Sequence, residues 1–211
     1  KNIRKGGNTM QAYGGYLRGI CLLAGYLLGG FLTAEAVARS LTGKSARALG
    51  TGNPGMANIT AQLGKAAGFA VLAGDVAKTV LAVWFCVRYA APELGRTAVL
   101  YAGLGAILGH NWSVWHGFYG GKGVAVTCTW LILYLPVTGL LCCLAGGAAV
   151  LLWGYLPVGA VLIPLLAVPL AGMQYGTEAG VGTALAAAIM LSRHAKGLWG
   201  AWQGTEPRFF Q

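Results

Sequence analysis

Residues 109–127 read GHNWSVWHGFYGGKGVAVT, a polar and glycine-rich stretch between two apolar segments. Lys122 lies in it among Gly120, Gly121 and Gly123. Glycines have no β-carbon, so their backbone N–H groups can converge on an anion, and a following helix adds its positive N-terminal end. A lysine in this setting is a point charge directed at a phosphate. The alternative is that the glycines only permit tight packing of a membrane turn, because no Walker-type spacing is present.

The composition on either side of this stretch excludes a soluble domain. The chain has 211 residues, of which 56% are hydrophobic and 9% charged, whereas soluble domains carry about 25% charged residues. We therefore predict an all-α, multi-pass integral membrane protein with a single domain over residues 11–211. Residues 1–10 are polar and begin without methionine, and we expect them to be a tag remnant or a disordered N-terminus.

The charge balance limits the partners. Fifteen Lys and Arg face five acidic residues, for a net charge of +10. This excess fits orientation by the positive-inside rule and attraction of anionic substrates or lipid head groups. Nucleic acid is not an expected partner, because no basic stripe interleaved with aromatics lies on a soluble face. The five cysteines all fall in apolar segments without metal-type spacing, so we interpret them as small buried hydrophobic residues.

Apolar periodicity predicts about seven membrane spans. The first three run roughly from Gly19 to Ala38, from Ala67 to Val87 and from Thr97 to Leu108, with a loop at 88–96. Proline and glycine divide the remainder into pieces near 124–135, 137–155, 157–174 and 177–193, some short enough to be kinked or re-entrant. A count of five gives the same parity, so the ends of the chain lie on opposite sides. The more basic connections then share one face, the cytoplasmic one.

Two further features suggest function. The segment 39–65 has four basic residues, no acid and the cluster GTGNPG at 50–55, which cannot be regular helix. Its hydroxyl, amide and backbone N–H groups suit an anion, although a plain solvated connector is the alternative. Asp75 and Lys78 are three residues apart within a span, so they share a helix face and can pair. Such residues are functional candidates by default, and a structural ion pair is the other interpretation.

Two motifs resemble those of a known family. Residues 50–58, GTGNPGMAN, resemble the G-S-G-N-x-G-A-T-N motif of the bacterial acyl-phosphate:glycerol-3-phosphate acyltransferases. Gly109-His110, Gly117-Phe118 and residues 120–125 (GGKGVA) are similar to that family's second motif. The spacing of the motifs, the Asp75/Lys78 pair and residues 204–206 also fit, and the match extends over nearly the whole chain from about Tyr26.

The resemblance implies a seven-helix membrane enzyme that moves a fatty acyl group from acyl phosphate to the 1-hydroxyl of glycerol 3-phosphate. The products would be lysophosphatidic acid and phosphate, with no cofactor or metal. The resemblance also implies an active site on the cytoplasmic face of the bacterial inner membrane, among membrane lipids and in contact with the enzyme that produces acyl phosphate. Thr51, Lys122 and His194 match the family's catalytic positions. The residues expected to bind substrate are Arg47, Gly52, Asn53, Gly55, Asn58, His110, Gly120, Gly121, Gly123 and Arg193.

The sequence departs from the family at four positions. Ala61 stands where an arginine is common, Tyr119 where a lysine is common, and Lys196 and Gly197 where the third motif has Glu and Asn. A lost arginine removes a bidentate phosphate fork. Two other interpretations therefore stay open: a paralog that has lost catalysis and acts as a partner or regulator of lipid synthesis, and a small anion transporter.

The sequence also limits the mechanism. It has no Ser-His-Asp arrangement, no Cys-His pair and no metal cluster, and none of its five acids lies in a glycine-rich motif. Acyl phosphate is already activated, and its departing phosphate is basic enough to accept the hydroxyl proton. The protein then has to hold two phosphates and stabilise developing charge. His194 is either a general base or a hydrogen-bonding partner of the substrate, and His110 is either a binding residue or a structural turn residue.

Overall fold

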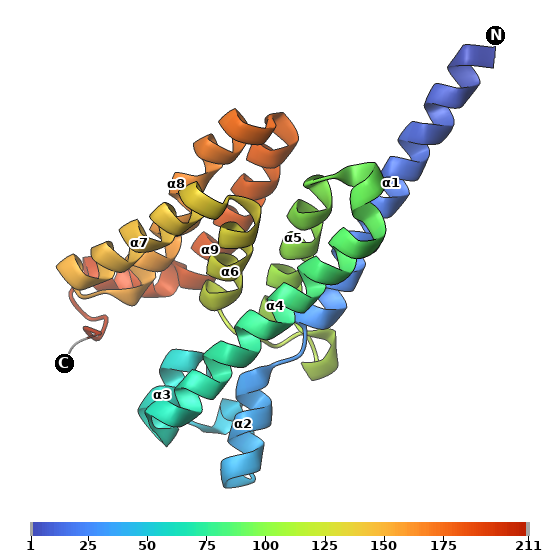
Figure 1. Cartoon of the computed structure of the whole chain (residues 1–211). Coiled ribbons are helices and arrows are strands. Elements are labelled where there is room, and N and C mark those ends of the chain that lie inside the picture. Colours follow the sequence, from blue (N-terminus) through green and yellow to red (C-terminus); the bar gives the residue numbers. More distant parts are fainter. Residues whose placement is uncertain (1, 210–211) are drawn as a thin grey trace. The chain divides into compact units, whose positions relative to one another are not determined.

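The structure is a computed structural model that describes the backbone of residues 2–209 and the side chains of residues 13–209. Over that range its regular elements are all helices, as expected for an all-α protein (Figure 1). The chain divides into two compact units, Lys1–Gly121 and Lys122–Gln211, so the division falls inside the glycine-rich stretch. The expected tag remnant at 1–10 lies outside the residues whose side chains are described, and the backbone of 2–10 is the first part of a helix.

Three long helices form the body of the first unit. They are α1 (Asn2–Gly29), α4 (Lys65–Leu94) and α5 (Thr97–Asn111), and each contacts the other two (Figure 1). Most of α5 is buried, which explains why it is apolar on all sides. Two short helices, α2 (Thr33–Thr42) and α3 (Met56–Leu63), pack against α4.

Helices α1 and α5 approach each other along glycines. A β-carbon at Gly25 would lie 2.1 Å from the carbonyl oxygen of Ala102, and one at Gly105 would lie 2.1 Å from that of Leu22. Each helix repeats this close approach four residues later, at Gly29 and Gly109. Small residues at this spacing let membrane helices bring their backbones into contact, where van der Waals packing drives association.

The expected continuous span from Gly19 to Ala38 is interrupted. Helix α1 ends at Gly29, and α2 begins at Thr33 after a short extended segment. Partners from residues 112–115 stabilise this helix end. The Ser113 hydroxyl donates to the carbonyl of Gly30 at 2.6 Å, and the Trp115 indole N–H donates to that of Leu27 at 2.9 Å. These bonds satisfy carbonyls that a helix end leaves without intrahelical partners.

Two other helix boundaries in this unit differ from those expected from the sequence. The expected loop at 88–96 is mostly helix, because α4 continues through Pro92 and ends only before Gly95. The expected loop at 39–65 contains α3. By length and composition, four segments of the described chain could cross a membrane: Tyr13–Thr42, Lys65–Leu94, Pro136–Trp153 and Leu156–Tyr175. Helix α6 (Val124–Tyr134) is also apolar but shorter.

The second unit contains α6 (Val124–Tyr134), α7 (Pro136–Trp153), α8 (Leu156–Tyr175) and α9 (Thr177–Trp202). Helix α8 contacts each of the other three. The helices divide at Pro136, Gly154 and Gly176, as the proline and glycine pattern predicts. The C-terminal tail folds back onto this unit, where the backbone N–H of Phe209 donates to the carbonyl of Gly154 at 2.8 Å.

Candidate active site

The first glycine loop, residues 49–55, is organised by one buried amide. The Asn58 side chain accepts from the backbone N–H of Thr51 at 3.0 Å and donates to the carbonyls of Leu49 and Asn53 at 2.9 and 3.0 Å. Both of its amide hydrogens are therefore used inside the loop. Gly52, with φ +74°, makes the turn that a side chain would strain. Asn58 shapes the loop on which Thr51 is presented.

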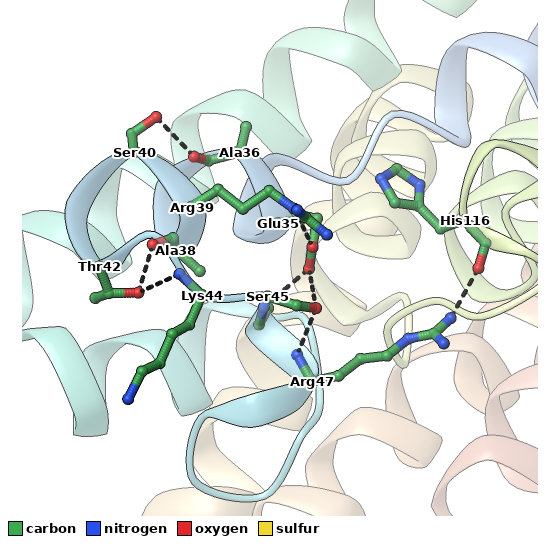
Figure 2. A network of polar contacts seen from close by, with 11 residues as sticks. Glu35, Ala36, Ala38, Arg39, Ser40, Thr42, Lys44, Ser45, Arg47 and His116 are labelled. Atoms are coloured by element: carbon green, nitrogen blue, oxygen red, sulfur yellow. Dashed lines mark hydrogen bonds and ion pairs between the residues drawn. The ribbon is translucent and has the colours of Figure 1, made fainter.

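A buried carboxylate holds the entry to this loop. Glu35 of α2 is 7% exposed and accepts from the Arg39 guanidinium at 2.6 Å. It also accepts from the Ser45 hydroxyl at 3.0 Å and from the backbone N–H of Ala46 at 2.9 Å (Figure 2). The short helix η1 (Ala46–Ala48) begins at this point, so Glu35 fixes the segment that leads to the loop.

Arg47 is held between two other groups of the first unit. Its Nη2 donates to the carbonyl of His116 at 2.7 Å (Figure 2). Its guanidinium carbon lies 3.7 Å from the centre of the Tyr119 ring, a cation–π geometry. The Tyr119 hydroxyl in turn donates to the carbonyl of Gly52. Tyr119, which replaces the family's common lysine, thus connects the first glycine loop to the second.

The second glycine loop, residues 117–123, lies directly on His110. The backbone N–H of Gly121 donates to the carbonyl of His110 at 3.0 Å. A β-carbon at Gly120 would lie 2.0 Å from that same carbonyl oxygen, and one at Gly121 would lie 2.3 Å from Nε2 of the ring. Both positions therefore require glycine. Phe118, with φ +59°, is the non-glycine residue of the described chain in left-handed backbone.

The Asp75/Lys78 pair predicted from the sequence is confirmed. The Lys78 ammonium lies 2.9 Å from Asp75 Oδ1. It also contacts Nδ1 of His110 at 2.8 Å and donates to the carbonyl of Phe31 at 2.7 Å. The pair therefore joins the middle of α4 to the base of the second glycine loop.

Lys122 begins the second unit, directly after Gly121 in the chain and one residue before the N-cap of α6. Gly123, with φ +79°, is that N-cap. The first N–H groups of α6 have no intrahelical partners, and the helix dipole adds positive charge beside Lys122. This end of the unit combines a lysine, a glycine turn and a helix N-terminus, the combination expected for a phosphate site.

His194 belongs to the same unit. It is 2% exposed, and its Nδ1 contacts the carbonyl of Met190 at 3.0 Å. Because a carbonyl can only accept, Nδ1 carries the proton and Nε2 is the free acceptor. Burial lowers the pKa of His194 to about 4, and the positive charges of Lys122 and Arg193 act in the same direction. His194 is therefore a neutral hydrogen-bonding group at physiological pH.

The third-motif departure at Gly197 has a visible physical basis. A β-carbon there would lie 2.6 Å from Cγ of Pro157 and 3.1 Å from Oε1 of Glu206. The space of the family's asparagine is thus occupied by a proline ring and a carboxylate. Ala61, in contrast, is exposed on α3, where an arginine would fit.

Each unit brings a set of the predicted site residues together. Thr51 and Arg47 share the first unit with most of the expected substrate-binding residues: Gly52, Asn53, Gly55, Asn58, His110, Gly120 and Gly121. Lys122 and His194 share the second with Gly123 and Arg193.

The sequence alone did not identify three contributors. The Glu35 carboxylate, the His116 carbonyl and the Tyr119 ring each hold the first glycine loop or Arg47. The departure at Tyr119 was visible from the sequence, but its cation–π partner Arg47 lies far from it in the chain. A backbone carbonyl carries no sequence signal.

Comparisons with known proteins identify the family of this chain. The family described as glycerol-3-phosphate acyltransferase matches residues 19–203. Glycerol-3-phosphate acyltransferase 1 of Lactobacillus johnsonii is 34% identical over 177 residues, which are 84% of this chain and 85% of that protein. Glycerol-3-phosphate acyltransferase of Nitrosospira multiformis is 35% identical over 190 residues, which are 89% and 94%.

A solved structure is also similar. The crystal structure of PlsY, an integral membrane glycerol 3-phosphate acyltransferase, in its glycerol 3-phosphate form has a TM-score of 0.81 and 26% identity to this chain. The similarity covers 92% of this chain and 99% of that one. Its lysophosphatidic acid form gives a TM-score of 0.79 at 25% identity.

Proposed function

Because the chain belongs to the glycerol-3-phosphate acyltransferase family, we propose that it transfers a fatty acyl group from acyl phosphate to the 1-hydroxyl of glycerol 3-phosphate. The reaction takes place at the cytoplasmic face of the bacterial inner membrane, where acyl phosphate arrives from the enzyme that produces it. An integral membrane acyltransferase of this family meets both a water-soluble phosphate and a lipid.

The reaction requires little covalent chemistry from the protein. The 1-hydroxyl oxygen attacks the acyl carbonyl, the bond from the carbonyl carbon to the phosphate oxygen breaks, and the hydroxyl proton ends on the departing phosphate. The products are lysophosphatidic acid and phosphate. Positioning of the two substrates and stabilisation of the developing charge supply the acceleration.

The described residues divide these tasks. Lys122 and the N-terminus of α6 hold a phosphate, and Thr51 supplies a hydroxyl from the first glycine loop. Arg47, exposed and pre-oriented by Tyr119 and the His116 carbonyl, supplies a second cation. Nε2 of His194 accepts a hydrogen bond from a substrate hydroxyl, a role that suits a neutral imidazole.

The single observation that carries this proposal is the environment of Lys122. It combines a glycine in left-handed backbone, a helix N-terminus and a charge that acts on His194. Each of these groups alone is common at a membrane turn. Their combination in the same unit as His194 suits a phosphate that leaves or binds.

The direct test is an assay of the purified protein with palmitoyl phosphate and labelled glycerol 3-phosphate. We expect lysophosphatidic acid to form, and Lys122→Ala to lose on the order of 2–4 kcal/mol of transition-state stabilisation, because one preorganised charge is removed. Lys44→Ala is the matched control. Lys44 is an exposed loop lysine outside the site, and its replacement should leave the rate unchanged.

Two results would contradict the proposal. Wild-type-like turnover by Lys122→Ala would leave the second glycine loop as a packing device. If the wild type forms no lysophosphatidic acid with acyl phosphates of several chain lengths, a paralog that has lost catalysis is favoured. The side chains of Pro157 and Glu206, which fill the space beside Gly197, also fit that alternative.

A further inference from the structure

A buried group of three side chains in the first unit has no place in the reaction described above. Asp75, Lys78 and His110 are 3%, 6% and 3% exposed. Burying ions costs free energy unless each is paired and hydrogen-bonded, and within a membrane segment such residues are functional candidates. These three residues are therefore candidates for a specific role in the function of the protein.

The partners of Lys78 account for every hydrogen of its ammonium. Nζ lies 2.9 Å from Asp75 Oδ1, 2.7 Å from the carbonyl oxygen of Phe31 and 2.8 Å from Nδ1 of His110. An ammonium has three N–H donors and no acceptor. Each contact then uses one donor, and Nδ1 of His110 must accept.

This assignment fixes the tautomer of His110. With Nδ1 accepting from Lys78, the imidazole proton lies on Nε2. Asp75 Oδ1 is 3.7 Å from Nδ1, which is too long for a direct hydrogen bond. The hydrogen-bonded link between the carboxylate and the ring therefore runs through Lys78.

The opposite edge of His110 meets the second glycine loop. Nε2 lies 2.3 Å from the position that a β-carbon of Gly121 would take, so the ring packs on that backbone. The carbonyl of His110 accepts from the Gly121 N–H at 3.0 Å. Ring and carbonyl together fix the path of Gly120 and Gly121, from which the chain continues directly into Lys122.

We propose that Lys78 and His110 are positioning residues for the second glycine loop: Asp75 holds Lys78, Lys78 orients His110, and His110 sets the backbone that presents Lys122. Neither residue touches substrate. The sequence predicted that His110 binds substrate. In this proposal His110 instead supports the second glycine loop from behind. The effect on turnover rests on the proposed acyltransferase function, whereas the effect on the loop does not.

The two edges of His110 can be separated by substitution. In His110→Asn the amide oxygen lies near the position of Nδ1, so it keeps the Lys78 bond but does not reach Gly121. In His110→Gln the amide reaches the position of Nε2 but loses the Lys78 bond. Lys78→Met removes the ammonium at similar length. Thr79→Val is the control, because Thr79 is a buried neighbour on α4 whose hydroxyl donates to the carbonyl of Asp75.

The first measurement is amide hydrogen exchange of the detergent-solubilised full chain, in peptides that cover residues 117–123. We expect faster exchange, on the order of tenfold or more, in Lys78→Met and His110→Asn, because the His110 carbonyl that accepts from the Gly121 N–H is then held less firmly. Peptides over residues 152–157 report overall folding and should be unchanged. Unchanged exchange at 117–123 in both variants overturns the proposal.

The second measurement is steady-state kinetics with both substrates varied. In Lys78→Met and His110→Asn we expect kcat/KM for glycerol 3-phosphate to fall by about 10²-fold at most. A misplaced loop lowers the fraction of enzyme in which the substrate is held in a productive geometry. The variant His110→Gln should recover part of this loss, whereas a structural role alone would lower the amount of folded enzyme at constant KM.

The outcomes separate the two proposals. Faster loop exchange together with an inactive wild type leaves the positioning role in place and removes the acyltransferase proposal. An active wild type whose KM is unchanged in Lys78→Met and His110→Asn overturns the positioning role. If Lys78→Met does not fold, the neutral pair Asp75→Asn with Lys78→Met and the two His110 variants decide the same question.

Discussion

His194 illustrates how burial assigns a role to a single residue. Its Nδ1–H is engaged by the carbonyl of Met190, and its pKa is lowered to about 4 by burial. A base this weak accepts a proton poorly at neutral pH, whereas the leaving phosphate is a better acceptor. The geometry therefore favours hydrogen bonding over general-base catalysis, the alternative that the sequence left open.

Replacing this histidine separates the two roles. We expect His194→Gln to keep measurable activity, within about tenfold of wild type, because glutamine still offers a hydrogen bond at similar reach. Loss of a general base typically costs 10²–10⁴-fold. The assay is the rate of lysophosphatidic acid formation between pH 5 and 8, where a wild-type titration near pH 6.5 assigned to His194 would contradict a folded pKa of about 4.

The same shift has a consequence for stability. The folded pKa lies below the ordinary histidine value of 6.5, so the unfolded chain binds a proton that the folded chain does not. Stability therefore falls as the pH drops from about 6.5 towards 4. The Tm of His194→Gln should depend less on pH across that window.

At the scale of elements, the junction of α2 with the first glycine loop depends on Glu35. Because this carboxylate accepts three bonds through both of its oxygens, one of them from a guanidinium, an amide with a single acceptor oxygen cannot satisfy all three donors. We expect Glu35→Gln to lower the free energy of unfolding by about 1–3 kcal/mol. Thermal unfolding in detergent would measure this.

A surface acid provides the comparison. Glu93→Gln, at an exposed position near the end of α4, should stay within about 0.5 kcal/mol of wild type. Arg39→Ala should also cost little, since the Arg39 side chain is 64% exposed and its pairing is screened by water. A Glu35→Gln variant as stable as Glu93→Gln would mean that Ser45 and Ala46 find other acceptors.

Most helices were predictable from local signals, and the exceptions have a tertiary cause. Gly154 and Gly176, both at positive φ, end α7 and α8 where the sequence suggested breaks. The end of α1 was missed because its partners, Ser113 and Trp115, lie more than eighty residues further along the chain. Pro92 falls near the C-terminal end of α4, which tolerates it.

The site residues show the same division. Glycine motifs marked the loops, because only glycine reaches the required backbone angles or close contacts. The groups that hold those loops, such as the Tyr119 hydroxyl and the Asn58 amide, act through backbone carbonyls that no sequence pattern records.

At the scale of the whole molecule, each unit places its site residues at one end. In the first unit Arg47 bonds the His116 carbonyl, so the first and second glycine loops lie at the same end of the helices. In the second unit Gly197, near the end of α9, meets Pro157 at the start of α8, and the tail bonds Gly154.

Cysteine labelling tests this sidedness. Single cysteines at Lys44, Val114 and Gln203, placed in a variant without the five native cysteines, should resist an impermeant thiol reagent in intact cells. A cysteine at Glu93 should react, because the predicted topology puts the α4–α5 turn on the other side. Labelling of any of the first three from outside would contradict a cytoplasmic site.

The glycine contacts between α1 and α5 also bear on how the chain is made. About 80 residues separate Gly29 from Gly109, and ribosomes add roughly 5–20 residues per second. The grooved face of α1 therefore waits in the bilayer for on the order of 10 s before its partner helix is synthesised. During that interval lipid tails, or a second nascent copy, meet a surface shaped for another helix. Correct assembly of this protein therefore depends on whether α5 is synthesised before the exposed face of α1 associates with a wrong partner.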